Sequence, residues 1–401
     1  MYLASVTHAP LPTPERHQRL DQLRGLAVLG ILPVNILLFS GPFAALANPM
    51  VWGELRGPNA VAWWLTRLLF EQKFLTLFCI LFGAGLVMQR LHLGPGPDAW
   101  RVHRRRMAFL FVLGLVHAYA IWYGDILAPY AICGLLLWPA TRWPAVRLWS
   151  LGLMLLTVPS IINWLAWFSL SGWSGAALEA LERSWQPHLA DLLTEIAAYR
   201  GDWFSQLRER VPQALYLQLQ LFPLASGWRL LGSMLLGMAA MRTDLLTGAA
   251  SLSGRTLRTG AWVLAGLGLA LTAWGGQELL VAGKSPIRAA LLSGQPLYWG
   301  SLAMAWAYLL LFPRQGFGGW AGISLACVGR TALSNYLLQS LLCTGIFYGT
   351  GLAMFGQLQR WQLLLMALTL GAGQLIVSRL WLSAFERGPL EQLWRRLSYR
   401  A

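Results

Sequence analysis

The sequence predicts an all-α protein, folded as a polytopic bundle of membrane-spanning helices. The chain of 401 residues is 56% hydrophobic and only 12% charged, whereas a soluble protein carries roughly a quarter charged residues. Its 22 Trp gather near the ends of apolar runs, as in the aromatic belts of membrane proteins. We therefore expect a single membrane domain over residues 1–401.

Apolar runs long enough to cross a bilayer recur along the whole chain. A span needs roughly 20 largely apolar residues, and by that rule we expect about ten spans. They lie near 22–40, 61–89, 107–123, 126–141, 147–169, 215–241, 259–281, 296–313, 328–349 and 361–384.

Basic residues in the loops predict the orientation. If the N-terminus is inside, the inner segments hold most of the 31 Lys and Arg but fewer than half of the 16 Asp and Glu. Cytoplasmic loops are enriched in Lys and Arg, so we expect both termini in the cytoplasm. On this orientation, the net charge of +15 reflects the basic residues that lie on the inner side of the membrane. Because the basic residues form no continuous stripe, we expect no nucleic-acid partner.

The longest connection, residues 170–214, is expected on the outer side. It carries apolar residues at helical spacing, which predicts an amphipathic helix on the outer membrane surface. The helix is either a simple connector or a lid on which an acceptor docks. The apolar positions are Leu178, Leu181, Trp185, Leu189, Leu192, Ile196 and Tyr199.

Polar residues inside spans are the candidate functional residues, since an ionisable group there costs about 2.5–3.5 kcal/mol on insertion scales. In the first span, Pro33 should bend the helix near Asn35. In the second, Glu71 and Lys73 stand two residues apart and should seek different partners. Asp125 is one such partner for Lys73, and a solvated helix end is the alternative.

His117 and Asp125 lie on the third apolar run. Eight helical residues advance roughly 12 Å, so the two side chains should share a broad face without direct contact. Water, Tyr123 or another helix could join them. A role in catalysis and a role in packing or in marking the helix end both remain open.

Three further polar residues lie deep in spans. Arg229 lies near the middle of the sixth span, where a cation most needs a partner. Asn335 and Gln339 are spaced i, i+4 and share one face of the ninth span. They either hold two helices together or line an inner vestibule that binds substrate.

A basic group is expected at the inner mouth of the bundle. Such a group suits phosphate or an anionic lipid head, although the positive-inside rule alone also places Arg there. Its members are Arg24, Arg101, Arg104, Arg105 and Arg106.

The remaining small residues suggest packing. The four cysteines lie in or beside apolar runs without a C-x-x-C pair, so we expect neither disulfide nor metal site. Gly83, Gly85, Gly266 and Gly268 lie within spans and should allow close helix contact. The chain contains no P-loop, G-x-S-x-G or H-E-x-x-H motif.

Five stretches resemble the YeiB family of bacterial membrane proteins, a family of unknown function. They follow the family order from one end of the chain to the other. The stretches are LDQLRGLAVLGILPVN (20–35), FEQKFLTLFCILFGAG (70–85), LGLVHAYAIWYGDILAPYA (113–131), GRTALSNYLLQS (329–340) and GPLEQLWR (388–395). The resemblance implies a multi-pass protein of the bacterial cytoplasmic (inner) membrane.

This family is in turn similar to the transmembrane acyltransferases, mainly through Leu23-Arg24-Gly25 at the start of the first span. In the bacterial O-acetylating enzymes a key histidine follows that arginine by about three helical turns. Here the corresponding region offers Asn35, which cannot act as a general base, and His117 is the nearest substitute.

We therefore expect a membrane acyltransferase-like protein. Acyl-CoA is the candidate co-substrate at the inner basic group, and no tightly bound cofactor is expected. His117 would remove the proton of an outer hydroxyl or amine, Asp125 would orient His117, and Asn35 would contact the reacting carbonyl. Glu71, Lys73, Arg229, Asn335 and Gln339 would bind substrate, with Arg229 or Lys73 stabilising the oxyanion.

Two other functions remain open. Intramembrane charges and bent helices also suit a transporter or flippase of a small molecule or lipid-linked intermediate. A non-catalytic scaffold or sensor would use the same charges only as structural pairs. The expected partners are membrane lipid and a small-molecule or lipid-linked substrate, and a homodimer is a candidate assembly.

Overall fold

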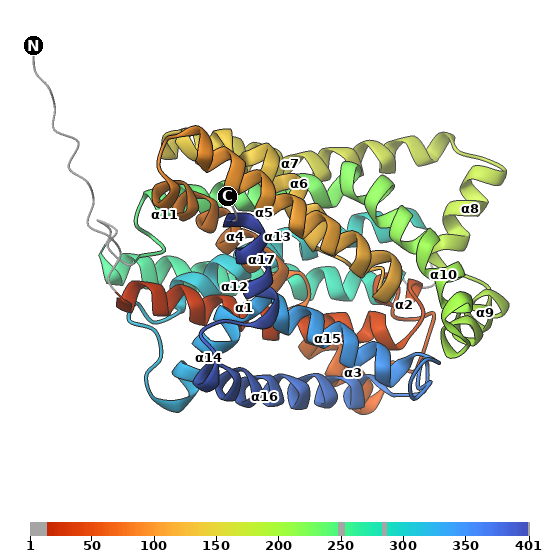
Figure 1. The fold of residues 1–401 in the computed structure, drawn as a ribbon. Helices are drawn as coiled ribbons and strands as arrows, with labels where there is room; N and C mark the ends of the chain where they lie inside the picture. The colour runs from red at the N-terminus through yellow and green to blue at the C-terminus, as the bar shows by residue number, and fades with distance from the viewer. Residues whose placement is uncertain (1–13, 248–252, 283–286, 400–401) are drawn as a thin grey trace, which may run out of the picture.

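A computed structural model describes residues 14–247, 253–282 and 287–399 of the chain. Every regular element in these ranges is helical, which confirms the all-α fold class. Six helices are long and apolar enough to cross a membrane, and two shorter apolar helices, Leu127–Leu137 and Ala332–Phe347, accompany them. Figure 1 shows most of these helices running side by side as one bundle.

The first half of the described chain contains these elements: α1 (Pro14–Ser40), α2 (Ala44–Ala47), α3 (Gly57–Leu65), η1 (Thr66–Phe70), α4 (Lys73–Leu93), α5 (Pro97–Val116), η2 (His117–Ile121), α6 (Leu127–Leu137), η3 (Pro139–Arg142), α7 (Ala145–Ser169), η4 (Leu170–Gly172), α8 (Ala176–Trp185) and α9 (Leu189–Arg200).

The second half contains α10 (Trp203–Leu215), η5 (Tyr216–Ser226), α11 (Gly227–Arg242), α12 (Gly254–Ala282), α13 (Ile287–Leu311), α14 (Gly319–Arg330), α15 (Ala332–Phe347), α16 (Arg360–Ala384) and α17 (Pro389–Tyr399). Of these, η1, η2 and η5 are π-helical.

Helix α1 lies in the middle of the bundle and packs against α4, α14, α15 and α16. Its contact with α14 depends on two glycines that face each other. A Cβ on Gly25 would lie 2.1 Å from the carbonyl oxygen of Leu325, and one on Gly329 would lie 1.7 Å from that of Asp21. The glycine beside Arg24 therefore has a packing role.

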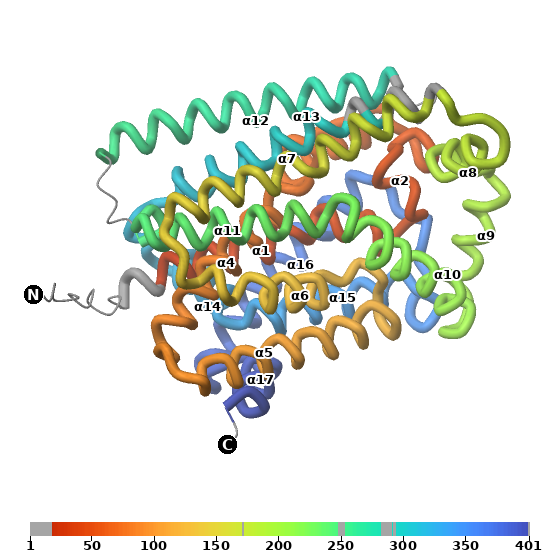
Figure 2. The backbone as a smooth tube through the Cα atoms, turned by 90° about the horizontal axis from the view of Figure 1, so that it is seen from above, coloured from red at the N-terminus to blue at the C-terminus, as the bar shows by residue number. Residues whose placement is uncertain are grey.

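A second close contact joins α4 and α11. A Cβ on Gly83 would lie 1.9 Å from the carbonyl oxygen of Met234, and one on Gly237 would lie 1.9 Å from that of Ile80. Only glycine lets the two backbones approach this closely. The expected packing role of Gly83 is thus confirmed. Helices α12 and α13 pair at one edge of the bundle (Figure 2).

Several expected spans are interrupted or extended. The run expected over 328–349 is broken near Thr331, between α14 and α15. The run expected over 215–241 belongs to a longer helix, Trp203–Arg242. The run expected over 107–123 begins earlier, at Pro97, and ends at Ile121. Hydrophobicity alone does not mark these points. The residues at a helix break or a π-helical turn are as apolar as those of the regular helix around them.

Residues 170–214 form η4, α8, α9 and α10 at the end of the bundle opposite the start of α1 (Figure 1). The predicted amphipathic character is present, but most of the apolar side chains pack on protein, with Leu189 an exposed exception. Trp185 joins Trp63, Leu170 and Leu279 in one buried cluster. A single helix lying on the membrane surface was therefore the wrong expectation. The segment covers the end of the bundle.

Candidate functional site

Three polar side chains form a continuous hydrogen-bonded chain inside the bundle. His117 Nδ1 lies 2.9 Å from Asp125 Oδ1, and His117 Nε2 lies 2.8 Å from Ser340 Oγ. The side chains of His117 and Asp125 are 0% and 1% exposed, respectively. An ionised carboxylate only accepts hydrogen bonds. With Asp125 ionised, His117 Nδ1 carries the hydrogen, and Nε2 presents its lone pair to the Ser340 hydroxyl.

The contact between His117 and Asp125 contradicts the expectation that they could not touch. His117 opens the π-helical turn η2, and the backbone becomes extended at Trp122. The chain then reverses and α6 begins at Leu127. Asp125 lies in this reversal, where its Oδ2 accepts a hydrogen bond from the Ala128 N–H at 2.8 Å. The expectation was wrong because it assumed one continuous helix.

Gly114 makes room for this arrangement. A Cβ at Gly114 would lie 2.7 Å from Asp125 Oδ2 and 2.3 Å from the backbone nitrogen of Ala128. The glycine therefore allows α5 to approach the start of α6. The position of the Asp125 carboxylate and the position of α6, which it caps, both depend on this close approach.

Ser340 comes from α15, far along the chain, and was not among the expected site residues. Tyr336, one turn earlier on α15, packs its ring 5.2 Å from the His117 ring and donates a hydrogen bond to the Gly124 carbonyl at 3.2 Å. Tyr336 therefore ties α15 to the reversal that carries Asp125. Ser340 lies in GRTALSNYLLQS, one of the five stretches that resemble the YeiB family. This resemblance is the signal that could have identified it.

Helix α17 fixes the start of α15. The Glu391 carboxylate accepts hydrogen bonds from the backbone N–H groups of Leu333 and Ser334, at 2.8 and 3.1 Å. These are donors that a helix leaves unsatisfied at its first turn. The stretch GPLEQLWR therefore caps the helix that carries Ser340.

Aromatic rings close the site on the side of α1. Trp122 stacks on Phe39 with ring centroids 3.9 Å apart, and its ring lies 6.0 Å from that of His117. Among the described residues, the buried indole Nε1–H of Trp122 has no hydrogen-bond partner of normal geometry, although it lies near the Tyr123 phenol. A buried donor without an acceptor is rare in proteins. This N–H group belongs to a ring whose centroid lies 6.0 Å from that of His117.

A second polar cluster lies where η1 meets α4. Arg67 pairs with Glu71 at 3.1 Å, and the Lys73 ammonium donates to the Arg67 carbonyl oxygen. The expected Lys73–Asp125 pair is therefore wrong, since Asp125 contacts His117 instead. Lys73 is fully buried and Arg67 is 3% exposed.

Arg229 completes the second cluster. Its guanidinium donates to Gln72 and, at 2.7 Å each, to the hydroxyls of Thr76 and Ser301. It also lies 4.8 Å from the Tyr298 ring centroid. Among the described residues, no hydrogen bond or ion pair joins this cluster to His117, Asp125 or Ser340.

Other expected site residues lie elsewhere. Asn335 donates to Ser378 at 2.9 Å, and Gln339 donates to Gln374 at 2.8 Å, so both hold α15 to α16. Asn35 is half-buried on α1. No hydrogen bond between described residues joins it to His117.

The inner basic residues have separate partners, although Arg24 lies close enough to Arg106 for the two charges to interact. Arg24 pairs with Asp21 at 2.9 Å, and the exposed Arg101 pairs with Asp98 at 3.2 Å. Arg106 lies 4.3 Å from the Trp394 ring centroid of α17. Arg104 is exposed and Arg105 is half-buried.

A buried carboxyl group lies at the covered end of the bundle. Glu195 of α9 accepts hydrogen bonds from the Phe43 N–H at 3.0 Å and from Gln213 at 2.8 Å. Burial raises the pKa of Glu195 to about 7, although both hydrogen bonds act in the opposite direction. This carboxyl group was not singled out from the sequence.

The chain matches known proteins along nearly its whole length. Residues 240–401 match the family described as "Protein of unknown function (DUF418)". "Uncharacterized protein YeiB" of Escherichia coli (strain K12) is 34% identical, over 96% of this chain and 97% of the relative. "Uncharacterized protein YxaH" of Bacillus subtilis (strain 168) is 30% identical, over 97% and 96%. No solved structure matches the chain. The chain therefore belongs to the YeiB family of helical membrane proteins.

Proposed function

We propose that this protein is a membrane acyltransferase in which Ser340 carries the acyl group, His117 moves the proton and Asp125 orients His117. The observation that supports this proposal is the chain of hydrogen bonds from Asp125 through His117 to Ser340. A hydroxyl, a base and an orienting carboxylate in this order activate a nucleophile on several unrelated folds.

The first half-reaction transfers the acyl group from a thioester such as acyl-CoA. Ser340 Oγ attacks the thioester carbonyl carbon and gives its proton to His117 Nε2. The tetrahedral intermediate collapses, the carbon–sulfur bond breaks, and the leaving thiolate takes the proton from His117. The products are the free thiol and an ester on Ser340.

The second half-reaction passes the acyl group to an acceptor. The acceptor hydroxyl or amine attacks the Ser340 ester while His117 Nε2 takes its proton. The ester bond breaks and the same proton returns to Ser340 Oγ. The cycle needs no oxidant, and His117 ends in the protonation state in which it began.

The unused N–H group of Trp122 suits the negative oxygen that forms during both half-reactions. A donor that is already in place, in a site without water, stabilises such an oxyanion more than a mobile donor does. We assign this role to Trp122 in place of Arg229 or Lys73, since those two cations are engaged in the second cluster. Asn35 of α1 remains a candidate contact for the substrate.

The reacting groups are closed off in this conformation, because His117 and Ser340 are 0% and 1% exposed. Substrate must therefore displace neighbouring side chains. Helix η2 is a π-helical segment that begins at His117. Such segments are frequent at functional sites. We place the donor on the side of Arg24, Arg101, Arg104, Arg105 and Arg106, in the cytoplasm, and the acceptor on the side of α8 to α10.

Release of free CoA tests the proposal. Purified protein is given acyl-CoA and a broad panel of hydroxyl and amine acceptors, and His117→Asn is compared with His103→Asn. His103 is a matched control, because it is also fully buried and hydrogen-bonded on α5. We expect CoA release to disappear in His117→Asn and to persist in His103→Asn. Equal release from wild type and His117→Asn would refute the proposal.

A transporter is the second candidate, and the cluster of Arg67, Glu71, Lys73 and Arg229 favours it. Three buried cations with one carboxylate mark the kind of intramembrane site that transporters use. Substrate flux into proteoliposomes without chemical change, lost in Lys73→Met but retained in His117→Asn, would support this candidate over acyl transfer.

A further inference from the structure

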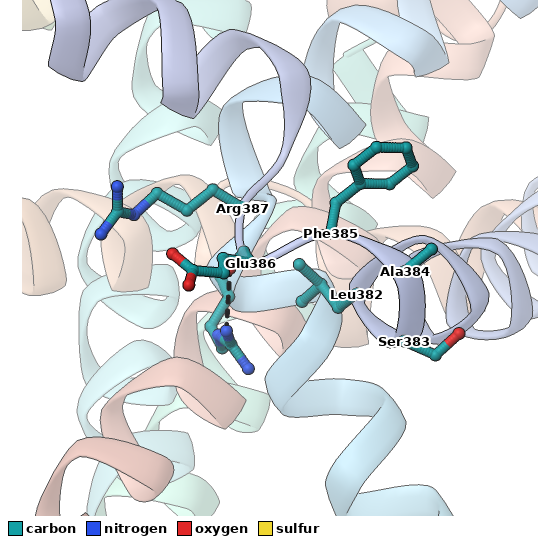
Figure 3. A pocket seen from close by; sticks show the side chains of 7 residues that line it. Leu382, Ser383, Ala384, Phe385, Glu386 and Arg387 are labelled. Carbon is teal, nitrogen blue, oxygen red and sulfur yellow. Dashed lines mark hydrogen bonds between the residues drawn. The ribbon is translucent and has the colours of Figure 1, made fainter.

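Two adjoining pockets lie at the turn between α16 and α17, outside the site described above. The larger has a volume of about 470 Å³ and the smaller about 280 Å³. Arg387 lines both. Figure 3 shows the Arg387 side chain and the Phe385 ring extending to opposite sides of this turn. The larger pocket is lined by Arg330 and residues 382–387, and the smaller by Arg387, Gln392, Arg395, Arg396 and Tyr399.

The pockets are strongly cationic. Four arginines line them together with a single acid, Glu386. Within the described ranges, no salt bridge engages any of the four. Arg330 donates to the backbone carbonyl of Glu386 at 3.0 Å, which leaves its other N–H groups available. Guanidinium groups with free N–H donors bind oxyanions such as phosphate through paired hydrogen bonds.

The turn itself is held in place. The indole N–H of Trp381 donates to the Arg387 carbonyl at 2.9 Å, and Glu391 anchors α17 to α15. The arginines therefore project from a fixed corner of the protein. A fixed corner binds a small anion with less loss of entropy than a mobile loop does.

Exposed apolar side chains lie on the same turn and helix as the cationic pockets. Phe385 is 52% exposed, and Leu393 and Leu397 on α17 are 45% and 44% exposed. A short helix with arginines on one side and exposed leucines on the other is typical of helices that lie in the membrane interface. A ligand that fits both the arginines and the exposed leucines carries a phosphate group and hydrocarbon chains.

We propose that the α16–α17 corner binds the phosphate of an anionic phospholipid. The arginines would contact the headgroup, while Phe385 and the exposed leucines of α17 would contact the acyl chains. The positive-inside rule accounts for arginines on the cytoplasmic side of the membrane. It does not account for two pockets that share Arg387. This proposal is independent of acyl transfer at Ser340.

Lipid binding to the full-length protein tests this proposal. Protein in a neutral detergent is titrated with phosphatidylglycerol and with phosphatidylcholine, and bound lipid is counted by native mass spectrometry. The variant Arg387→Ala/Arg395→Ala is compared with Arg255→Ala/Arg258→Ala. The second pair removes two exposed arginines from α12, away from the pockets. Inorganic phosphate and CoA are added as competitors in separate titrations.

We expect the wild type to prefer phosphatidylglycerol, and the α16–α17 variant to bind it about thirtyfold more weakly, since it lacks two arginines that each contribute about 1 kcal/mol near the surface. The α12 variant should bind like wild type, and unchanged phosphatidylcholine binding should show that the variants fold. Equal losses in both variants, equal affinity for the two lipids, or displacement by low concentrations of CoA or phosphate would overturn the proposal.

Discussion

His117 Nδ1 lies 2.9 Å from Asp125 Oδ1, although His117 opens η2 and Asp125 lies in the chain reversal that precedes α6. The same carboxylate caps α6 through the Ala128 N–H. Asp125 therefore does two things at once: it fixes the fold of the reversal and fixes the orientation of the imidazole ring. Any substitution of Asp125 has to be judged on both effects.

Asp125→Asn should separate the two effects of Asp125. The amide oxygen can still accept from Ala128, so α6 stays capped. The amide N–H₂ would face His117 Nδ1 and force the hydrogen onto Nε2, which then cannot take the proton of Ser340. We expect CoA release to fall roughly 10²–10⁴-fold, while thermal unfolding in detergent shows a folded protein. Wild-type turnover in a folded Asp125→Asn protein would show that Asp125 serves the fold alone.

Glu195 should make stability depend on pH. Because burial raises its pKa from 4.5 to about 7, the folded state favours the protonated carboxyl group. Its stabilising contribution is complete below about pH 4.5 and is lost as pH rises through about 7. The unfolding temperature in detergent should thus fall over this range, with the nearby Glu209 adding to the effect.

Glu195→Gln is the variant that checks this dependence. The glutamine oxygen can still accept from Phe43 and Gln213, but it does not titrate. The fall in unfolding temperature should become shallower in Glu195→Gln and remain in Glu182→Gln, a control on the exposed surface of α8. Identical profiles for wild type and Glu195→Gln would contradict the assignment.

Two glycines on α12 should respond differently to the same change. A Cβ on Gly268 would lie 2.5 Å from Met304 Cγ and 2.8 Å from the Gly300 carbonyl oxygen of α13, whereas one on Gly266 would meet nothing within 4 Å. Gly268→Ala should therefore force α12 and α13 apart and lower the unfolding temperature. Gly266→Ala should be neutral, or stabilise by up to about 1 kcal/mol through helix propensity. Equal effects would contradict the close packing of these helices.

The sequence predicts the helical membrane bundle well because composition and the length of apolar runs depend on the bilayer itself. It does not reveal where helices break. The stretch around His117 and Asp125 is otherwise largely apolar, yet it contains a π turn, an extended residue and a reversal. These features depend on neighbours such as Gly114, whose close approach has no signature in local hydrophobicity.

The candidate site is accessible to sequence reasoning only in part. His117 and Asp125 stand out because ionisable residues are costly in a span. Ser340 does not, since a hydroxyl in a helix commonly bonds to a backbone carbonyl one turn earlier, as Ser340 also does with Tyr336 at 3.4 Å. Its contact with His117 joins residues 223 positions apart. A contact between residues this far apart is visible only in the folded bundle and not in the sequence.

Detection of an acyl group on Ser340 tests the central claim most directly. Purified protein is incubated with acyl-CoA without acceptor and digested, and peptides are analysed by mass spectrometry. Ser233→Ala is the control, because Ser233 is also fully buried. We predict acylation of the peptide containing Ser340 in wild type and Ser233→Ala, and none in Ser340→Ala or His117→Asn. Release of CoA that continues undiminished in folded Ser340→Ala protein, with no acyl group at residue 340 of the wild type, would contradict the account.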